Sequence, residues 1–500
     1  MAAIAAGERV ELAEAAAAQM EASCAVVRRA AREHTPVYGI NTGFGKLCEV
    51  RIPDGDLARL QLNLVRSHAC GLGAPLSEAE TRLVVALRAN TLALGYSGVR
   101  PAVALTLVEM VNRGVLPVIP SKGSVGASGD LAPLAHVALC AIGEGEAIYR
   151  GERLGGGEAL RRAGIEPVRL EAKEGLALLN GTQALTATGA LALWRGIRLA
   201  GLADVSGAIT LAALLGTAAA FDQRIHAARP HAGQGAVAAH LRWLLVGSGL
   251  EPGRRTVPAR VQDAYSLRCM PQVHGAVRGA LGFAAAAVET ETGAATDNPL
   301  VFAETGDVLS GGNFHGAPLA LGFDTAAIAL ATLGGITERR MDRLVNPDLN
   351  QGLPAFLAAH PGLGSGFMMA HVAAVALLAE SKVLAHPASV DNLPTSGGQE
   401  DHVSMGMTAA LKLRTIVENG ERIAAIELLA AAEALRYRDG LDPGPELRRV
   451  IAAVREIAAP LDEDRPLSRD IESVAAAIAD GKFDEWAMPE AACAPVAVIP

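Results

Sequence analysis

The 500-residue chain has few aromatic residues and no patterned cysteines, and each lack excludes classes of protein. Phenylalanine, tryptophan and tyrosine together make up 3% of it. The six cysteines form no CxxC pair or other metal-ligand spacing, which argues against a disulfide framework or a metal site and predicts a reduced, cytoplasmic protein. The formal net charge is −9 and there is no block of lysine and arginine, so nucleic acid is not an expected partner.

Apolar residues make up half of the chain, and alanine and leucine dominate them, which favours closely packed helices over sandwiches or barrels. Such a length exceeds one compact core. We therefore expect a mainly α protein, with a loop-rich N-terminal domain over residues 1–195 and a helical bundle over 196–500. Long helical runs are predicted at 182–221, 272–290, 318–340, 366–385 and 407–437. Helices this apolar in an acidic chain indicate subunit interfaces, and so a homo-oligomer.

Two segments bear on membrane association. Residues 361–379 carry no Asp, Glu, Lys or Arg and are long enough to span a bilayer. Their glycines, Ser365 and His371 predict instead a helix buried in a large soluble assembly, so no membrane partner is expected. A first helix is expected over about residues 7–32, without the basic start of a signal peptide.

The most unusual stretch is GSVGASGDLAPLAH, residues 123–136. If the Gly129 nitrogen attacks the Ala127 carbonyl carbon and two waters leave, the product is an electrophilic methylidene-imidazolone ring. Glycine lets the nitrogen approach at low steric cost, and Ser128 supplies the hydroxyl that is eliminated. Ala-Ser-Gly alone is usually a plain turn. The glycine-rich frame that ends in an apolar helix start favours a functional reading.

Other polar motifs are candidates for ligand contact. Residues 38–46 hold three glycines and form a loop that can approach a ligand closely. Asn180 follows an apolar helical stretch, where capping is the ordinary alternative. Gln262, Tyr265 and Arg268 lie at i, i+3 and i+6, either as a surface face or as groups converging on one small polar ligand. An arginine there would suit a carboxylate.

Later polar motifs lie close to apolar segments. Residues 297–299 and 311–316, the latter containing Phe314, have the composition of loops. Residues 399–404 place four consecutive polar side chains before an apolar run. A charge run is usually a solvated face, but this one predicts a polar site set into a helical wall.

In order and spacing, these motifs resemble the aromatic amino acid ammonia-lyases, and especially the histidine ammonia-lyases, from about residue 38 to 482. Gly397-Gly398 stands where an Ala-Asn pair is common. The resemblance implies an aspartase/fumarase-like helical bundle and a homotetramer with active sites shared between subunits. It also implies a 4-methylidene-imidazol-5-one (MIO) group formed from Ala127, Ser128 and Gly129, with no external cofactor. The implied reaction eliminates ammonia from L-histidine to give trans-urocanate.

The same resemblance assigns roles to individual residues. Tyr38 would be the base that removes the β-proton, and because a phenol titrates at about pH 10 its phenolate would need stabilisation. Arg268, supported by Asn180, would bind the substrate carboxylate. Tyr265 and Gln262 would line the prosthetic group and Phe314 the pocket wall. The electrophile could capture the amine or the ring of the substrate, and we favour the amine.

Two positions bear on the choice of ring. Ser67-His68 is the histidine-type pair, where phenylalanine enzymes carry Phe-Leu and tyrosine enzymes His-Leu. Glu400 suits an imidazole N–H, and a buried carboxylate left unpaired is costly, so an apolar ring should be rejected. Both features favour L-histidine as substrate.

Four alternatives remain for comparison. A phenylalanine or tyrosine ammonia-lyase, or an aminomutase, would use the same group but is disfavoured by His68 and Glu400. A serine hydrolase is excluded because neither Ser124 nor Ser128 lies in G-x-S-x-G. A phosphate-binding loop at residues 39–46 has the wrong spacing, with Leu47 in place of Ser or Thr. A non-catalytic helical binding protein would leave the tripeptide and Glu400 unexplained.

Overall fold

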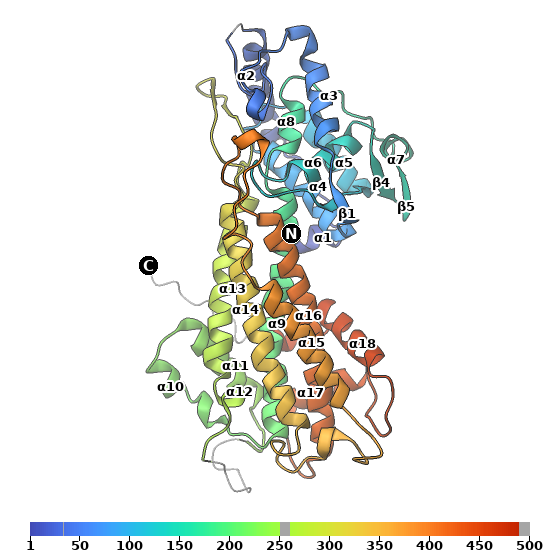
Figure 1. Ribbon diagram of the computed structural model, residues 1–500, viewed down its shortest axis with the longest axis vertical. Helices are drawn as coiled ribbons and strands as arrows, with labels where there is room; N and C mark the ends of the chain where they lie inside the picture. Colours follow the sequence, from blue (N-terminus) through green and yellow to red (C-terminus); the bar gives the residue numbers. More distant parts are fainter. Residues whose placement is uncertain (34, 251–260, 490–500) are drawn as a thin grey trace. The chain divides into compact units, whose positions relative to one another are not determined.

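The computed structural model describes residues 1–33, 35–250 and 261–489, and helices dominate them (Figure 1). They form two compact units. Unit 1 comprises residues 1–191, 285–323 and 387–411, and unit 2 comprises 192–284, 324–386 and the described residues from 412 onward. The mainly α prediction is confirmed. The chain first passes from unit 1 to unit 2 between Leu191 and Ala192 but returns twice, and a simple boundary at residue 195 stays a prediction.

Unit 1 carries the shorter helices: α1 (Ala2–Ala5), α2 (Glu14–Arg32), α3 (Leu57–His68), α4 (Glu78–Ala93), α5 (Pro101–Arg113), α6 (Leu131–Ala141), α7 (Gly156–Ala163) and α8 (Glu174–Leu179). Local chemistry sets their ends. Ser77 and Glu80 form a reciprocal capping box at the start of α4. The expected helix over 7–32 is wrong at its start, because Gly7 has φ +110° and α2 begins only at Glu14.

The strands are few and short, as predicted, and all lie in unit 1. They are β1 (Leu72–Pro75), β2 (Val115–Pro117), β3 (Pro120–Lys122), β4 (Glu146–Tyr149), β5 (Glu152–Gly155), β6 (Leu300–Phe302) and β7 (Asp307–Leu309). They pair antiparallel as β1–β3, β2–β4–β5 and β6–β7. The β1–β3 pair leads directly into the glycine-rich segment, because β3 ends one residue before Gly123.

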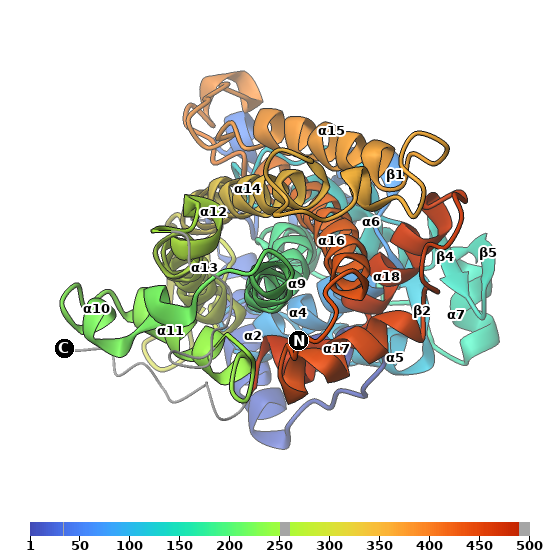
Figure 2. The same ribbon diagram turned by 90° about the horizontal axis from the view of Figure 1, so that it is seen from below.

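Unit 2 is helical: it holds α10 (Gln223–Ala227), α11 (Ala232–Leu244), α12 (Tyr265–Arg268), α15 (Met368–Leu384), α17 (Pro445–Arg455), α18 (Ser468–Ala479), α19 (Asp484–Ala487) and parts of α9 (Gln183–Ala213), α13 (Met270–Thr292), α14 (Ala317–Val345) and α16 (Gly406–Arg436). Figure 2 shows α9 among α13, α14 and α16. Small residues allow this packing: a Cβ on Gly196 would lie 2.8 Å from Leu330. The run predicted to 221 ends at Ala213, and Leu215 has φ +53°.

A network of paired charges lies inside this bundle. Arg340 and Glu427 are fully buried and joined by hydrogen bonds of 2.5 and 2.8 Å. Asp204 accepts hydrogen bonds from His240 and His274, at 2.8 and 2.6 Å. Burial opposes its ionisation, but Arg278 and the two histidines hold its pKa well below the usual range. Buried charges of this kind are tolerated because each is paired.

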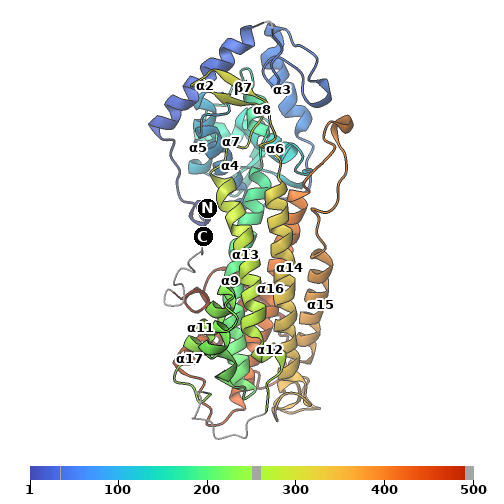
Figure 3. The ribbon, with the colours of Figure 1, turned by 90° about the vertical axis from the view of Figure 1, so that its left-hand side faces the viewer.

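Helices α9 and α14 are long and apolar enough to cross a membrane, but most of each lies inside the protein, as in core helices. The segment at 361–379 is different. Its helix, α15, buries Ala370, Ala374 and Leu378 but exposes Met369 and Val372 at 64% and 50%. Figure 3 shows α15 at the outer edge of the helices of unit 2. Only one face of α15 is covered within the single chain, and burial of the other face in an assembly stays a prediction.

Candidate active site

The glycine-rich segment forms a tight loop between β3 and α6. Gly126 and Gly129 have φ of +68° and +71°, values that L side chains rarely adopt. Gly129 lies against Gly181 in a parallel bridge, and a Cβ on Gly129 would sit 2.2 Å from the Gly181 oxygen. Only glycine fits at Gly129, on grounds of both conformation and space.

The C-terminal side of this loop is held by Asp130, which is fully buried. Its backbone N–H donates to the Gly181 oxygen at 2.7 Å, and its carboxylate accepts from Leu185 N–H at 2.7 Å and from the Ser124 hydroxyl at 2.6 Å. Burial raises the pKa of Asp130 to about 6, against the lowering effect of these hydrogen bonds. The carboxyl group thus links both ends of the loop to the start of α9.

The N-terminal side is held by residues 403–406. Met405 N–H donates to the Val125 oxygen at 2.8 Å, and the Ser404 hydroxyl donates to the Gly126 oxygen at 3.0 Å. Residues 403–405 lie outside any helix or strand, immediately before α16, and Met405 has φ +58°. Residues 399–405 themselves form no helix and the segment pairs with the loop, while the expected polar site within a helical wall stays a prediction.

Four helices begin beside the loop. Helix α6 follows it directly, α9 starts two residues before Leu185, α14 starts just after Gly316, and α16 starts just after Met405. Gly316 N–H itself donates to the Gly126 oxygen at 3.3 Å. Helix N-termini carry partial positive charge, so the loop lies in a region that favours negative charge on its carbonyl oxygens.

Ser128 is held at both of its oxygens. Its hydroxyl donates to Glu400 at 2.8 Å, and its carbonyl oxygen accepts from the Asn180 side-chain amide at 2.8 Å. The other carboxylate oxygen of Glu400 accepts from the Thr395 hydroxyl at 2.5 Å. Asn180 follows the end of α8, and its side chain contacts Ser128 where helix capping was the alternative.

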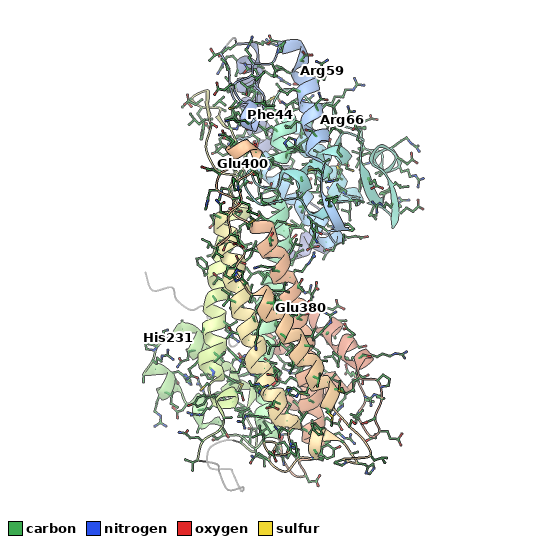
Figure 4. The ribbon with its side chains drawn as sticks, viewed as in Figure 1. Phe44, Arg59, Arg66, His231, Glu380 and Glu400 are labelled. Atoms are coloured by element: carbon green, nitrogen blue, oxygen red, sulfur yellow. The ribbon has the colours of Figure 1, made fainter. Side chains whose placement is uncertain are left out.

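Two cavities meet at these residues, and Tyr38, Ser128, Asn180 and Glu400 line both. The first has a volume of about 780 Å³ and is mostly apolar, and its lining includes Phe44 and Glu400, which are labelled in Figure 4. The second, of about 570 Å³, is polar and includes Phe314. A ligand with an aromatic ring and a charged end could use both.

His68 lines the apolar cavity from the last residue of α3. Its Nδ1 lies 2.9 Å from the Leu64 oxygen and 3.0 Å from the Ser67 hydroxyl. A carbonyl partner favours a proton on Nδ1, which leaves Nε2 as the free acceptor. His68 can therefore offer an acceptor to a polar ring, and Glu400 can offer another.

Tyr38 lies in the predicted loop, half-buried, with its ring edge-on to Phe44. Burial raises its pKa above the ordinary value, although a backbone hydrogen bond at Gly45 opposes this. The nearby charge of Glu400 raises the pKa further. Unit 1 therefore does not provide the phenolate stabilisation that the proposed base requires.

Gln262, Tyr265 and Arg268 do come together, but in unit 2. Arg268 donates to Gln262 at 3.1 Å, and its guanidinium lies 4.6 Å from the centre of the Tyr265 ring. They line a polar cavity of about 780 Å³, and the Tyr265 side chain is 71% exposed. Among the described residues, neither cavity at Ser128 includes any of the three.

Sequence reasoning missed the groups that hold the loop. Thr395 and Ser404 each donate one hydrogen bond to the site, yet isolated hydroxyl residues carry no recognisable pattern. Arg88, buried behind Asn180, was also missed. The described ranges contain no group of three or more His, Cys, Asp or Glu that could hold a metal ion.

Comparison with known proteins identifies the family. The model of the aromatic amino acid lyase family matches residues 1–456, and the chain belongs to that family. It is 56% identical over 484 residues to a histidine ammonia-lyase of Anaeromyxobacter sp. (strain K), covering 95% of each chain. It is 55% identical to that of Koribacter versatilis (strain Ellin345), covering 94% of this chain and 93% of the relative.

Solved structures agree. The histidine ammonia-lyase of Trypanosoma cruzi has a TM-score of 0.90 at 42% identity, covering 98% of this chain and 93% of that one. The tyrosine aminomutase of Streptomyces globisporus has a TM-score of 0.91 at 39% identity, covering 97% and 95%. The resemblance noted in the sequence is thus confirmed, and the lower identity to the aminomutase does not favour that alternative.

Proposed function

We propose that this protein is a histidine ammonia-lyase, which eliminates ammonia from L-histidine to give trans-urocanate. One observation carries the proposal: Ser128 of the tripeptide, Glu400 and His68 line the same cavity, with Glu400 hydrogen-bonded to Ser128. The relatives named histidine ammonia-lyase support it at about 55% identity. The proposed enzyme is thus a carbon–nitrogen lyase.

The local geometry fits an MIO group made from Ala127, Ser128 and Gly129. A new bond would join the Gly129 nitrogen to the Ala127 carbonyl carbon, and that carbonyl oxygen would leave as water with the N–H protons of Gly129 and Ser128. A second water would take the Ser128 hydroxyl and the proton on its Cα. The glycine conformations and the clamp on both sides of the loop favour this closure. The group supplies an electrophilic methylidene carbon, which activates the substrate for loss of its amine.

Substrate choice rests on the apolar cavity. Its hydrophobic wall suits the flat ring, while either His68 Nε2 or Glu400 can accept a hydrogen bond from the imidazole N–H. A phenyl ring offers no N–H or O–H donor to His68 or Glu400, so the site gains no polar contact from it. This disfavours phenylalanine, whereas tyrosine, whose phenol can donate, is disfavoured by the histidine-type pair Ser67-His68. The related lyases and aminomutases remain the second candidate.

The remaining substrate groups need residues from a second copy of the chain. Tyr38, as the base, requires a cation to lower its raised pKa, and the substrate carboxylate requires an arginine. Arg268, with Tyr265 and Gln262, meets both needs but lies in unit 2, outside the Ser128 cavities. We therefore propose a cytoplasmic homotetramer in which one copy supplies these three residues to another, and the exposed apolar face of α15 suits such an assembly.

Intact mass and product formation together test the proposal. The wild-type chain should weigh two waters less than its written sequence and should release a conjugated product from L-histidine. Ser128→Ala should keep the oligomer, show no mass deficit and lose turnover. Thr395→Ser serves as a matched control, because it keeps the hydroxyl that contacts Glu400 and should keep both the deficit and the activity. An unmodified wild-type chain would refute the proposal.

A further inference from the structure

A buried arginine, Arg88, contacts the residue that holds the carbonyl oxygen of Ser128. Arg88, on α4, is fully buried, and its Nη1 contacts only neutral acceptors: Asn180 O at 3.0 Å, Gln183 Oε1 at 2.8 Å and Thr296 O at 3.2 Å. Its Nε and Nη2 have no hydrogen-bond partner within the described part of the chain. Burial lowers the pKa of Arg88 to about 10, so the guanidinium stays charged at neutral pH.

This arrangement is costly for stability alone. The nearest carboxylate to influence Arg88, Asp297, is already paired with the buried Lys173 at 2.9 Å. Two buried cations therefore share one anion. A buried charge without a direct counter-ion destabilises a fold, and such perturbed charges concentrate at functional sites.

The contacts of Arg88 lead to the tripeptide through one residue. Asn180 accepts from Arg88 at its backbone oxygen, and its side-chain amide donates to the Ser128 oxygen at 2.8 Å. The next residue, Gly181, is fitted against the guanidinium, since a Cβ there would lie 2.3 Å from Arg88 Nη1. Gly181 O in turn accepts from Asp130 N–H. Arg88 thus fixes the backbone that holds Ser128 and Asp130.

We propose that Arg88 is a positioning residue that holds the Asn180 amide on the Ser128 oxygen and so sets the electron-accepting strength of the prosthetic group. The inference rests on the proposed function. In the MIO group the Ser128 oxygen becomes the ring oxygen, where negative charge gathers when a nucleophile adds. A donor fixed at that oxygen before the reaction stabilises this charge, and a distant cation in a dry environment strengthens it.

The test measures the electrophile without substrate. Purified wild type, Arg88→Met, Arg88→Lys and Gln183→Met are first weighed intact and then treated with 2-mercaptoethanol, and the loss of the near-ultraviolet band gives the rate of thiol addition. Gln183→Met is the matched control, because it removes another buried partner of Arg88 but leaves the Asn180 contact. We expect Arg88→Met to react roughly 10- to 100-fold more slowly, because losing a direct oxyanion donor costs about 100- to 1,000-fold.

The rate of thiol addition to Arg88→Lys should lie between those of Arg88→Met and wild type, since a lysine keeps the charge but not the forked geometry. Gln183→Met should react at nearly the wild-type rate. Failure of an Arg88 variant to show the two-water deficit, with Gln183→Met complete, would also support positioning. If Arg88→Met does not fold, the comparison of the thiol-addition rates of Arg88→Lys and Gln183→Met tests the proposal instead. Equal rates in Arg88 variants and wild type, or equal slowing in Gln183→Met, would overturn this inference alone, whereas a wild type without the deficit would overturn the proposed function.

Discussion

Replacing Glu400 by glutamine would separate the charge of this residue from its shape. Glu400 is half-buried and accepts hydrogen bonds from Ser128 at 2.8 Å and Thr395 at 2.5 Å. A glutamine can keep the first as an acceptor and donate to the Thr395 hydroxyl through its amide. The fold, the oligomer and the mass deficit should therefore persist.

Two effects set the size of the loss. A charge-assisted hydrogen bond to the imidazole contributes about 1.5–3 kcal/mol, against about 1 kcal/mol for a neutral one, so binding of the ring should weaken about tenfold. If Glu400 also moves a proton in the reaction, the rate falls by a further factor of about 100 to 10,000. We expect kcat/KM for L-histidine to fall by about 1,000-fold or more in Glu400→Gln.

The assay follows the absorbance of the conjugated product at saturating and limiting histidine, with the intact mass as a check on ring formation. Thr395→Val removes one donor to Glu400 while keeping its charge, and should cost less than about tenfold. If Glu400→Gln turns over histidine within threefold of wild type while carrying the complete mass deficit, the assignment of Glu400 to the imidazole is wrong.

Three further outcomes are expected. Tyr38→Phe should lower kcat by about 100- to 10,000-fold without changing the mass deficit, and an unchanged kcat would remove Tyr38 as the base. Ser128→Ala and Arg268→Ala should each be inactive, but the two chains co-expressed should regain a fraction of the activity if one copy supplies Arg268 to another. No recovery in isolated mixed oligomers would contradict a shared site. Burial raises the pKa of Asp130 from 3.8 to about 6, so its ionisation penalises the folded state, and this penalty grows as the pH rises through this range. Between pH 4 and 7 the wild type should lose up to about 3 kcal/mol of its free energy of unfolding through this group, and Asp130→Asn should not show that loss. Urea unfolding at several pH values measures it. Parallel pH profiles for variant and wild type would exclude the effect.

Much of the helical architecture could be predicted from the sequence, because long apolar runs without proline form helices wherever they are packed. The predicted run at 407–437 is α16, Gly406–Arg436. The predicted helix bounds are wrong near Gly7 and Leu215, because both residues have positive φ and a helix cannot continue through them. The exposed face of α15 could not be predicted because composition does not say which side a partner would cover.

The reactive and ring-binding residues of the candidate site could be predicted from the sequence, but the hydrogen bonds that hold them in place could not. Ala-Ser-Gly, His68 and Glu400 are rare in combination, so a motif could identify them. The hydrogen bonds from Ser404 to Gly126 and from Arg88 to Asn180 join positions far apart in the chain, and no local pattern encodes them. The expected division at residue 195 already placed Ser128 and Arg268 in different domains, and the two residues lie in different units.

The hydrogen bonds that hold the glycine-rich loop at both of its ends have a consequence for biosynthesis. Ser404 lies 278 residues after Gly126, whose carbonyl oxygen accepts its hydrogen bond. This hydrogen bond therefore cannot form until most of the polypeptide has left the ribosome. An electrophile whose formation depends on these hydrogen bonds would be absent from nascent and truncated chains. Quality control would then be built into the chemistry, since a reactive centre would arise only in molecules that had already finished folding around it.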